Sequence, residues 1–126
     1  MRVVPKLALY LLFFMGVVSC QSQQGNAIKR IDKQTLKEDV IGKDVQLLDV
    51  RTPGEYKAGH IEGAVNFDLS KPSNFLKQLE ELDKDRPVYL YCLVGSRSDY
   101  AAKVLEEQGF TKIFDYSGGY ADWVRD

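Results

Sequence analysis

The amino-acid sequence predicts an α/β domain with a small, mostly parallel sheet flanked by helices. Short runs of β-branched and aromatic residues alternate with segments of helical periodicity, as in strands joined by crossover helices. The 126 residues, 44% of them hydrophobic, suffice for one compact core but not for two. Because the ligands of such sheets bind beyond the carboxyl ends of the strands, we expect the functional site at that edge.

The elements are expected to alternate through residues 27–126. Strands are predicted over short apolar runs at 27–31, 45–50, 64–67, 88–91 and 112–116. Helices are predicted at 33–41 behind the N-cap Asp32, at 54–59 as a single turn, from Pro72 onwards, at 96–108 and from about 120. Two apolar helical faces are expected to be buried, one with Phe75, Leu76, Leu79 and Leu82 and the other with Tyr100, Ala101, Val104 and Leu105.

A cysteine follows the strand predicted at 88–91 and faces the start of the next helix. The unpaired amides and the positive dipole end of that helix stabilise an anion, so they should lower the pKa of the Cys92 thiol. Gly95 allows the backbone to curl around the sulfur, and Arg97 adds a permanent cation. These neighbours favour a reactive cysteine over a small buried hydrophobic residue, which is the more common role of a free cysteine.

Charge and composition exclude several classes of function. The formal net charge is −1 and no basic run is present, so we expect no nucleic-acid partner. His60 is the only histidine, and no Cys/His cluster has the spacing of metal ligands, so we expect no metal and no cofactor. Cys20 and Cys92 lie in such different contexts that we do not expect them to form a disulfide.

The N-terminal segment combines basic residues, an apolar run and a cysteine. Arg2 and Lys6 precede twelve apolar residues, Leu7 to Val18, a run that is short for a membrane-spanning helix. Ser19 and Cys20 follow that run, and the whole segment resembles a bacterial lipoprotein signal peptide. The resemblance implies a signal peptide over 1–19, a lipid on Cys20, a polar tether over 20–26 and a domain over 27–126. The protein would then be exported to the cell envelope or periplasm and held at the membrane by its lipid. A cleaved soluble precursor and an uncleaved anchor are the other interpretations.

Three blocks of residues form a recognisable pattern along the chain. They are Leu48-Asp49-Val50-Arg51 with Glu55, His60, Gly63-Ala64 and Asn66; the loop from Cys92 to Arg97; and Gly118-Gly119-Tyr120 followed by Trp123. Together, in this order and spacing, they resemble the single-domain rhodaneses. The resemblance implies a small sheet between helices and a sulfurtransferase. In that activity Cys92 would be the nucleophile, and would carry sulfane sulfur as a persulfide from a donor, such as thiosulfate, to a thiophilic acceptor.

The same resemblance implies roles for the residues around the cysteine. The substrate-binding cradle would consist of the amides of Leu93, Val94, Gly95, Ser96, Arg97 and Ser98. Arg97 would either contact an anionic donor or pair with a carboxylate such as Asp49. His60 would be structural. Asp49 and Arg51 follow a predicted strand end, where we expect a structural ion pair or a brace for the loop rather than acid–base groups.

The partners implied are a small sulfur donor and a thiol or thioredoxin-like acceptor. Leu93 and Val94 make the rim of the loop apolar. That rim favours a protein-bound or low-molecular-weight persulfide as the donor over thiosulfate.

Two other functions fit parts of the pattern. A phosphatase or arsenate reductase also pairs a loop cysteine with an arginine, but its loop is longer than the four residues between Cys92 and Arg97. A shorter loop should fit a sulfur atom and crowd a phosphate. The second is a non-catalytic rhodanese-like module for binding or sensing, against which the presence of Cys92 argues.

Overall fold

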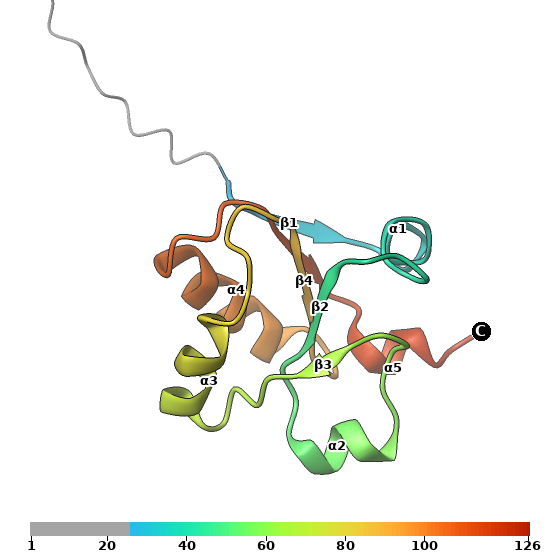
Figure 1. The fold of residues 1–126 in the computed structure, drawn as a ribbon. Coiled ribbons are helices and arrows are strands. Elements are labelled where there is room, and N and C mark those ends of the chain that lie inside the picture. Colours follow the sequence, from blue (N-terminus) through green and yellow to red (C-terminus); the bar gives the residue numbers. More distant parts are fainter. Residues whose placement is uncertain (1–25) are drawn as a thin grey trace, which may run out of the picture.

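The computed structural model of the protein describes residues 26–126, and its strands form one parallel sheet (Figure 1). The five strands in this range run in the order β1-β5-β4-β2-β3, and every neighbouring pair is parallel. Their bounds are Ile28–Ile31 for β1, Gln46–Asp49 for β2, Val65–Asn66 for β3, Val88–Tyr91 for β4 and Ile113–Tyr116 for β5. The predicted α/β fold is confirmed.

Helices cover both faces of the sheet. They are α1 at Lys33–Asp39, α2 at Pro53–Ala58, α3 at Pro72–Leu79, α4 at Ser96–Glu107 and α5 at Gly119–Trp123. Figure 1 shows α3 and α4 on one side of the strands and α1 and α5 on the other. The core is divided accordingly into two buried clusters, and Cys92 belongs to the cluster under α3 and α4.

Strand β4 is buried along its whole length and separates the two clusters. Val88 and Leu90 pack towards α3 and α4, whereas Tyr89 and Tyr91 belong to the opposite cluster. This alternation follows from the two-residue period of a strand, and burial on both faces explains the continuous apolar run in its sequence. The strand therefore delivers Cys92, the next residue, to the carboxyl edge of the sheet.

Two helical faces are rotated from their predicted positions. Leu76 and Tyr100 were expected to be buried, but 42% and 62% of their surfaces are exposed. Helix α3 buries Phe75 and Leu79 instead. Helix α4 buries Ser98, Ala101, Ala102 and Leu105. The small side chains of this face allow α4 to lie close to the sheet, so the larger Tyr100 is turned outward.

The predicted signal peptide over 1–19, the lipid site Cys20 and the tether up to residue 25 lie outside the described residues. Export and lipid anchoring therefore stay predictions. Between residues 26 and 126, no helix combines the length and the apolar character needed to cross a membrane.

Candidate active site

The loop from Cys92 to Ser98 joins the end of β4 to the start of α4, and its shape depends on Gly95. Gly95 precedes the helix with a φ of 100°, a conformation that favours glycine. A Cβ atom at this position would lie 2.5 Å from the carbonyl oxygen of Ser117. No other residue fits between the loop and the β5–α5 turn without displacing backbone.

The loop surrounds the sulfur of Cys92 with hydrogen-bond donors. The amide of Gly95 donates to Sγ over 3.1 Å, and the hydroxyl of Ser98 lies 3.6 Å from the same atom. Burial acts to raise the pKa of the Cys92 thiol. The amides of Ser98, Gly95 and Val94, together with the Ser98 hydroxyl, outweigh burial and lower that pKa. The site therefore favours a thiolate, although the cysteine is 0% exposed.

Helix α5 holds the other side of this loop. The amide of Tyr120 donates to the carbonyl oxygen of Cys92 over 2.8 Å, and that of Ala121 donates to Leu93 over 3.1 Å. Gly119, with a φ of 70°, lets the turn come this close, since its Cβ would lie 2.4 Å from the Leu93 oxygen. The cradle is thus built from two segments that are far apart in the sequence.

Arg97 forms an ion pair with Glu55 of α2. Nη1 and Nη2 of Arg97 donate to the two carboxylate oxygens over 2.7 and 3.0 Å. The suggested pairing of Arg97 with Asp49 is wrong, because the Asp49 carboxylate is buried and already holds Arg51. Hydrogen bonds from Arg97 are the main reason why the pKa of Glu55 is lowered to about 2. The pair fixes the first turn of α4 against α2.

Asp49 and Arg51 form a buried ion pair behind the loop. Nη2 of Arg51 lies 2.6 Å from Oδ2 of Asp49, and the hydroxyl of Tyr91 donates to the same oxygen over 2.7 Å. Arg51 also donates to the Gly59 carbonyl over 2.7 Å and lies 4.3 Å from the ring centre of Tyr120. This network links the ends of β2 and β4 to α5, which is the helix that binds the loop.

The remaining predicted site residues lie around these groups. Val94 and Leu93 are 66% and 37% exposed, so the rim of the loop is apolar. Ser96 is exposed at the first position of α4. His60 is also exposed, stacks on Tyr56 with ring centres 3.8 Å apart and bonds the Tyr56 carbonyl through Nδ1.

Sequence reasoning missed the contributions of Tyr91 and Asp115 to this region. Tyr91 is an aromatic residue inside a buried strand, a pattern that is typical of core packing rather than of a hydrogen-bond donor to Asp49. Asp115 lies within the otherwise apolar strand β5 and is 1% exposed. A single acidic residue in such a strand is the one sequence feature that could have drawn attention to it.

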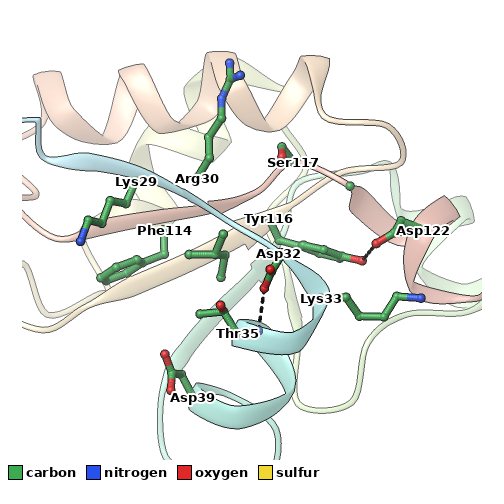
Figure 2. Close-up of a pocket in the computed structure, with 12 residues that line it drawn as sticks. Lys29, Arg30, Asp32, Lys33, Thr35, Asp39, Phe114, Tyr116, Ser117 and Asp122 are labelled. Atoms are coloured by element: carbon green, nitrogen blue, oxygen red, sulfur yellow. Dashed lines mark hydrogen bonds between the residues drawn. The ribbon is translucent and has the colours of Figure 1, made fainter.

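A separate surface pocket lies beside β1 and includes no residue of the loop from Cys92 to Ser98 (Figure 2). Its charged side chains are Lys29, Arg30, Lys33, Asp32, Asp39 and Asp122. The equal numbers of cations and carboxylates give the pocket no charge preference. Asp32 caps α1 by accepting from the Thr35 amide, and the Tyr116 hydroxyl donates to Asp122. The pocket therefore offers no evident chemistry.

Replacing Glu55 with glutamine should weaken the fold by up to about 1 kcal/mol, because the pair with Arg97 is partly exposed. The folded-state pKa of Glu55 is lowered from 4.5 to about 2, so the stabilisation is complete above pH 4.5 and is lost as the pH falls towards 2. Urea unfolding of Glu55→Gln and of the unchanged protein should differ at pH 7 and converge near pH 2. Glu81→Gln, at an exposed carboxylate, is the control and should show no such convergence.

Comparisons with known proteins are consistent with this arrangement. The rhodanese-like domain model matches residues 32–126. The chain is 35% identical over 118 residues to the uncharacterized protein YqhL of Bacillus subtilis, covering 93% of this chain and 89% of that protein. It is 33% identical over 98 residues to the thiosulfate sulfurtransferase GlpE of Shewanella oneidensis, covering 78% of this chain and 94% of that protein. Among solved structures, a rhodanese-like domain protein from Staphylococcus aureus matches with a TM-score of 0.68 and 28% identity, covering 78% of this chain and 93% of that chain.

Proposed function

Because the chain belongs to the rhodanese-like domain family, we propose that it is a sulfurtransferase that carries sulfane sulfur as a persulfide on Cys92. The observation that carries the proposal is the set of donors around Sγ, which includes the Gly95 amide at 3.1 Å. Fixed amide dipoles stabilise negative charge without reorganisation. They favour the thiolate before transfer and the charged persulfide after it.

The transfer consists of two displacements at sulfur. The Cys92 thiolate attacks the outer sulfur of the donor, a new S–S bond forms, and the old bond breaks with its electron pair leaving on the remainder of the donor. With thiosulfate the leaving group is sulfite. An acceptor thiolate or cyanide then attacks the outer sulfur of Cys92-S-S⁻, and the bonding pair returns to Cys92 as the thiolate. Neither step requires a proton, a metal or a redox partner.

Similarity to a relative and the exposed rim of the loop support the proposed donors, and the proposed acceptor rests on thiol chemistry. Similarity to a thiosulfate sulfurtransferase supports thiosulfate as one donor. The exposed apolar side chains of Leu93 and Val94 instead suit a persulfide carried by a protein or a small thiol. The acceptor is a thiol or a thioredoxin-like protein. If the N-terminal segment acts as a lipoprotein signal, this exchange takes place outside the cytoplasm.

The test is the intact mass of the protein after incubation with thiosulfate and, separately, with a polysulfide. We expect one added sulfur atom that cyanide or dithiothreitol removes. Cys92→Ser should abolish the addition, because serine cannot form the persulfide. Absence of added sulfur with both donors would indicate a non-catalytic module. Hydrolysis of an aryl phosphate that depends on Cys92 would instead indicate a phosphatase.

A further inference from the structure

We propose that Asp115 is a positioning residue for Cys92: its protonated carboxyl donates a hydrogen bond to the Ser98 hydroxyl and thereby directs that hydroxyl to the cysteine sulfur. The proposal rests on the role of Cys92 as the nucleophile. It concerns the state of the thiol before any donor arrives, so it can be tested without sulfur transfer.

Asp115 lies on the face of the sheet that α4 covers. It is in register with Leu90 of β4, two residues before Cys92. Its neighbour two residues earlier in β5, Ile113, packs in the same buried cluster as Leu90 and Cys92. Since side chains two residues apart in a strand share a face, Asp115 points towards the first turns of α4. A carboxyl group is unusual at this position, because the other residues of the strand pack in the hydrophobic core and acidic residues are rarely buried without a partner.

The carboxyl of Asp115 lacks a hydrogen-bond partner. Neither Oδ1 nor Oδ2 is bonded to any residue that the structure describes, although the residue is only 1% exposed. A buried polar group without a partner costs about 1–3 kcal/mol, so its presence calls for an explanation. Ser98 is buried on the face of α4 that packs against this side of the sheet, and its hydroxyl acts to lower the pKa of the Asp115 carboxyl.

Ser98 connects this carboxyl with the cysteine. It is 0% exposed, its Oγ lies 3.6 Å from Sγ of Cys92, and its hydroxyl donates to the Gly95 carbonyl over 3.2 Å. A hydroxyl has one proton and two lone pairs. While Cys92 is a thiol, its S–H donates to Oγ and the serine proton is free to bond Gly95.

Ionisation of Cys92 changes the hydrogen bonds that are available to the Ser98 hydroxyl. The thiolate, and later the persulfide, has no proton to give, so the lone pair of Oγ loses its donor. A protonated Asp115 supplies a replacement, and the serine proton then turns from Gly95 to the sulfur. Each group in the chain Asp115, Ser98, Cys92 donates to the next, and the negative charge ends on sulfur.

The surroundings of Asp115 raise the pKa of its carboxyl, which is the direction that the proposal requires. Burial raises the pKa of the carboxyl, and the nearby Asp99 carboxylate raises it further, whereas the Ser98 hydroxyl and Arg30 act to lower it. Arg30 comes from β1 and already binds Asp99 over 3.3 Å. Figure 2 shows the Arg30 side chain extending from β1 towards the overlying helix. Leu90, the partner on β4, is apolar. Once ionised, Asp115 would accept the serine proton and withdraw it from the sulfur.

The test is the pKa of the Cys92 thiol, measured from the pH dependence of its alkylation by iodoacetamide and from thiolate absorbance. Asp115→Leu keeps the side-chain shape but removes the donor, so alkylation near pH 6 should slow several-fold as the thiol pKa rises. Asp115→Asn retains N–H donors and should react much as the unchanged protein does. Ser98→Ala should also raise the thiol pKa, and adding Asp115→Leu to it should raise that pKa no further.

Packing alone predicts a different pattern. It predicts that Asp115→Leu leaves the thiol pKa unchanged, or that its effect is the same with and without Ser98. Either result overturns the proposal. An unchanged thiol pKa in Ser98→Ala also overturns it, and this second test can be made even if Asp115→Leu fails to fold. Asp44→Asn, an acid-to-amide change at a fully exposed carboxylate before β2, at the opposite edge of the sheet, is the matched control and should leave alkylation unaltered. A raised thiol pKa in a protein that never accepts sulfur would refute the sulfurtransferase activity and leave this inference standing.

Discussion

Replacing Arg51 with methionine should lower the free energy of unfolding by about 3–5 kcal/mol, the cost of leaving one member of a buried ion pair alone. The side chains of Asp49 and Arg51 are 0% and 3% exposed, so water cannot replace the lost partner. Burial raises the pKa of Tyr91, which stays a neutral donor to Asp49 and cannot balance its charge. Urea unfolding at neutral pH measures the loss.

Arg86→Met is the matched control for this prediction. Arg86 is 44% exposed and lies 3.8 Å from Asp44, which is fully exposed, so this substitution should cost little. The double variant Asp49→Leu/Arg51→Met should recover part of the loss, because it removes both charges together. Equal costs for Arg51→Met and Arg86→Met would show that the buried pair does not hold the fold.

Replacing Gly119 with alanine should slow sulfur loading of Cys92 by about a hundredfold, the penalty that a displacement of about 1 Å can cause at a reacting atom. The new Cβ would lie 2.4 Å from the Leu93 carbonyl oxygen and 2.7 Å from that of Cys92. Both atoms are backbone, so no side chain can move aside. The cradle itself must shift, and the rate of persulfide formation measures the shift.

Gly42→Ala separates this clash from backbone strain. Gly42 has a φ of 75°, close to the 70° of Gly119, but nothing lies within 4 Å of its Cβ position. The Gly42→Ala variant should therefore lose about 1 kcal/mol of unfolding free energy, because alanine is strained in the left-handed conformation, and should keep its rate of sulfur loading. A rate in Gly119→Ala equal to that in Gly42→Ala would contradict the role assigned to the turn before α5.

The sequence predicted the fold well, including the strand and the helix on either side of Cys92, because these elements depend on local patterns. Strand β4 is a continuous apolar run, and Gly95 directly precedes a helix of regular period. The rotation of helix α4 about its own axis was harder to predict. Periodicity identifies an apolar stripe that contains Tyr100 and Ala101, but which side of that stripe contacts the sheet depends on how closely the helix packs. The small buried residues of α4 contact the sheet, so Tyr100 is exposed.

Long-range pairings lay beyond local patterns. Arg97 and Glu55 are 42 positions apart, and their pairing depends on where the turn after β2 places α2. Asp49 is also a carboxylate near a strand end, so the sequence could not show whether Asp49 or Glu55 is the partner of Arg97. The position of Asp115 beside Leu90, on the face of the sheet that α4 covers, likewise depends on the register of β5 against β4.

The bonds from Tyr120 and Ala121 to the cysteine loop make the reactivity of the thiol a property of the complete fold. All of α4 and β5 separates the two segments, so no local folding of the loop can create the cradle. In an unfolded or partly folded chain, Cys92 is an ordinary cysteine with an ordinary thiol pKa and little nucleophilicity at neutral pH. The thiol of Cys92 thus becomes a good nucleophile only after α5 has docked, and the rate of Cys92 alkylation during refolding reports that last step.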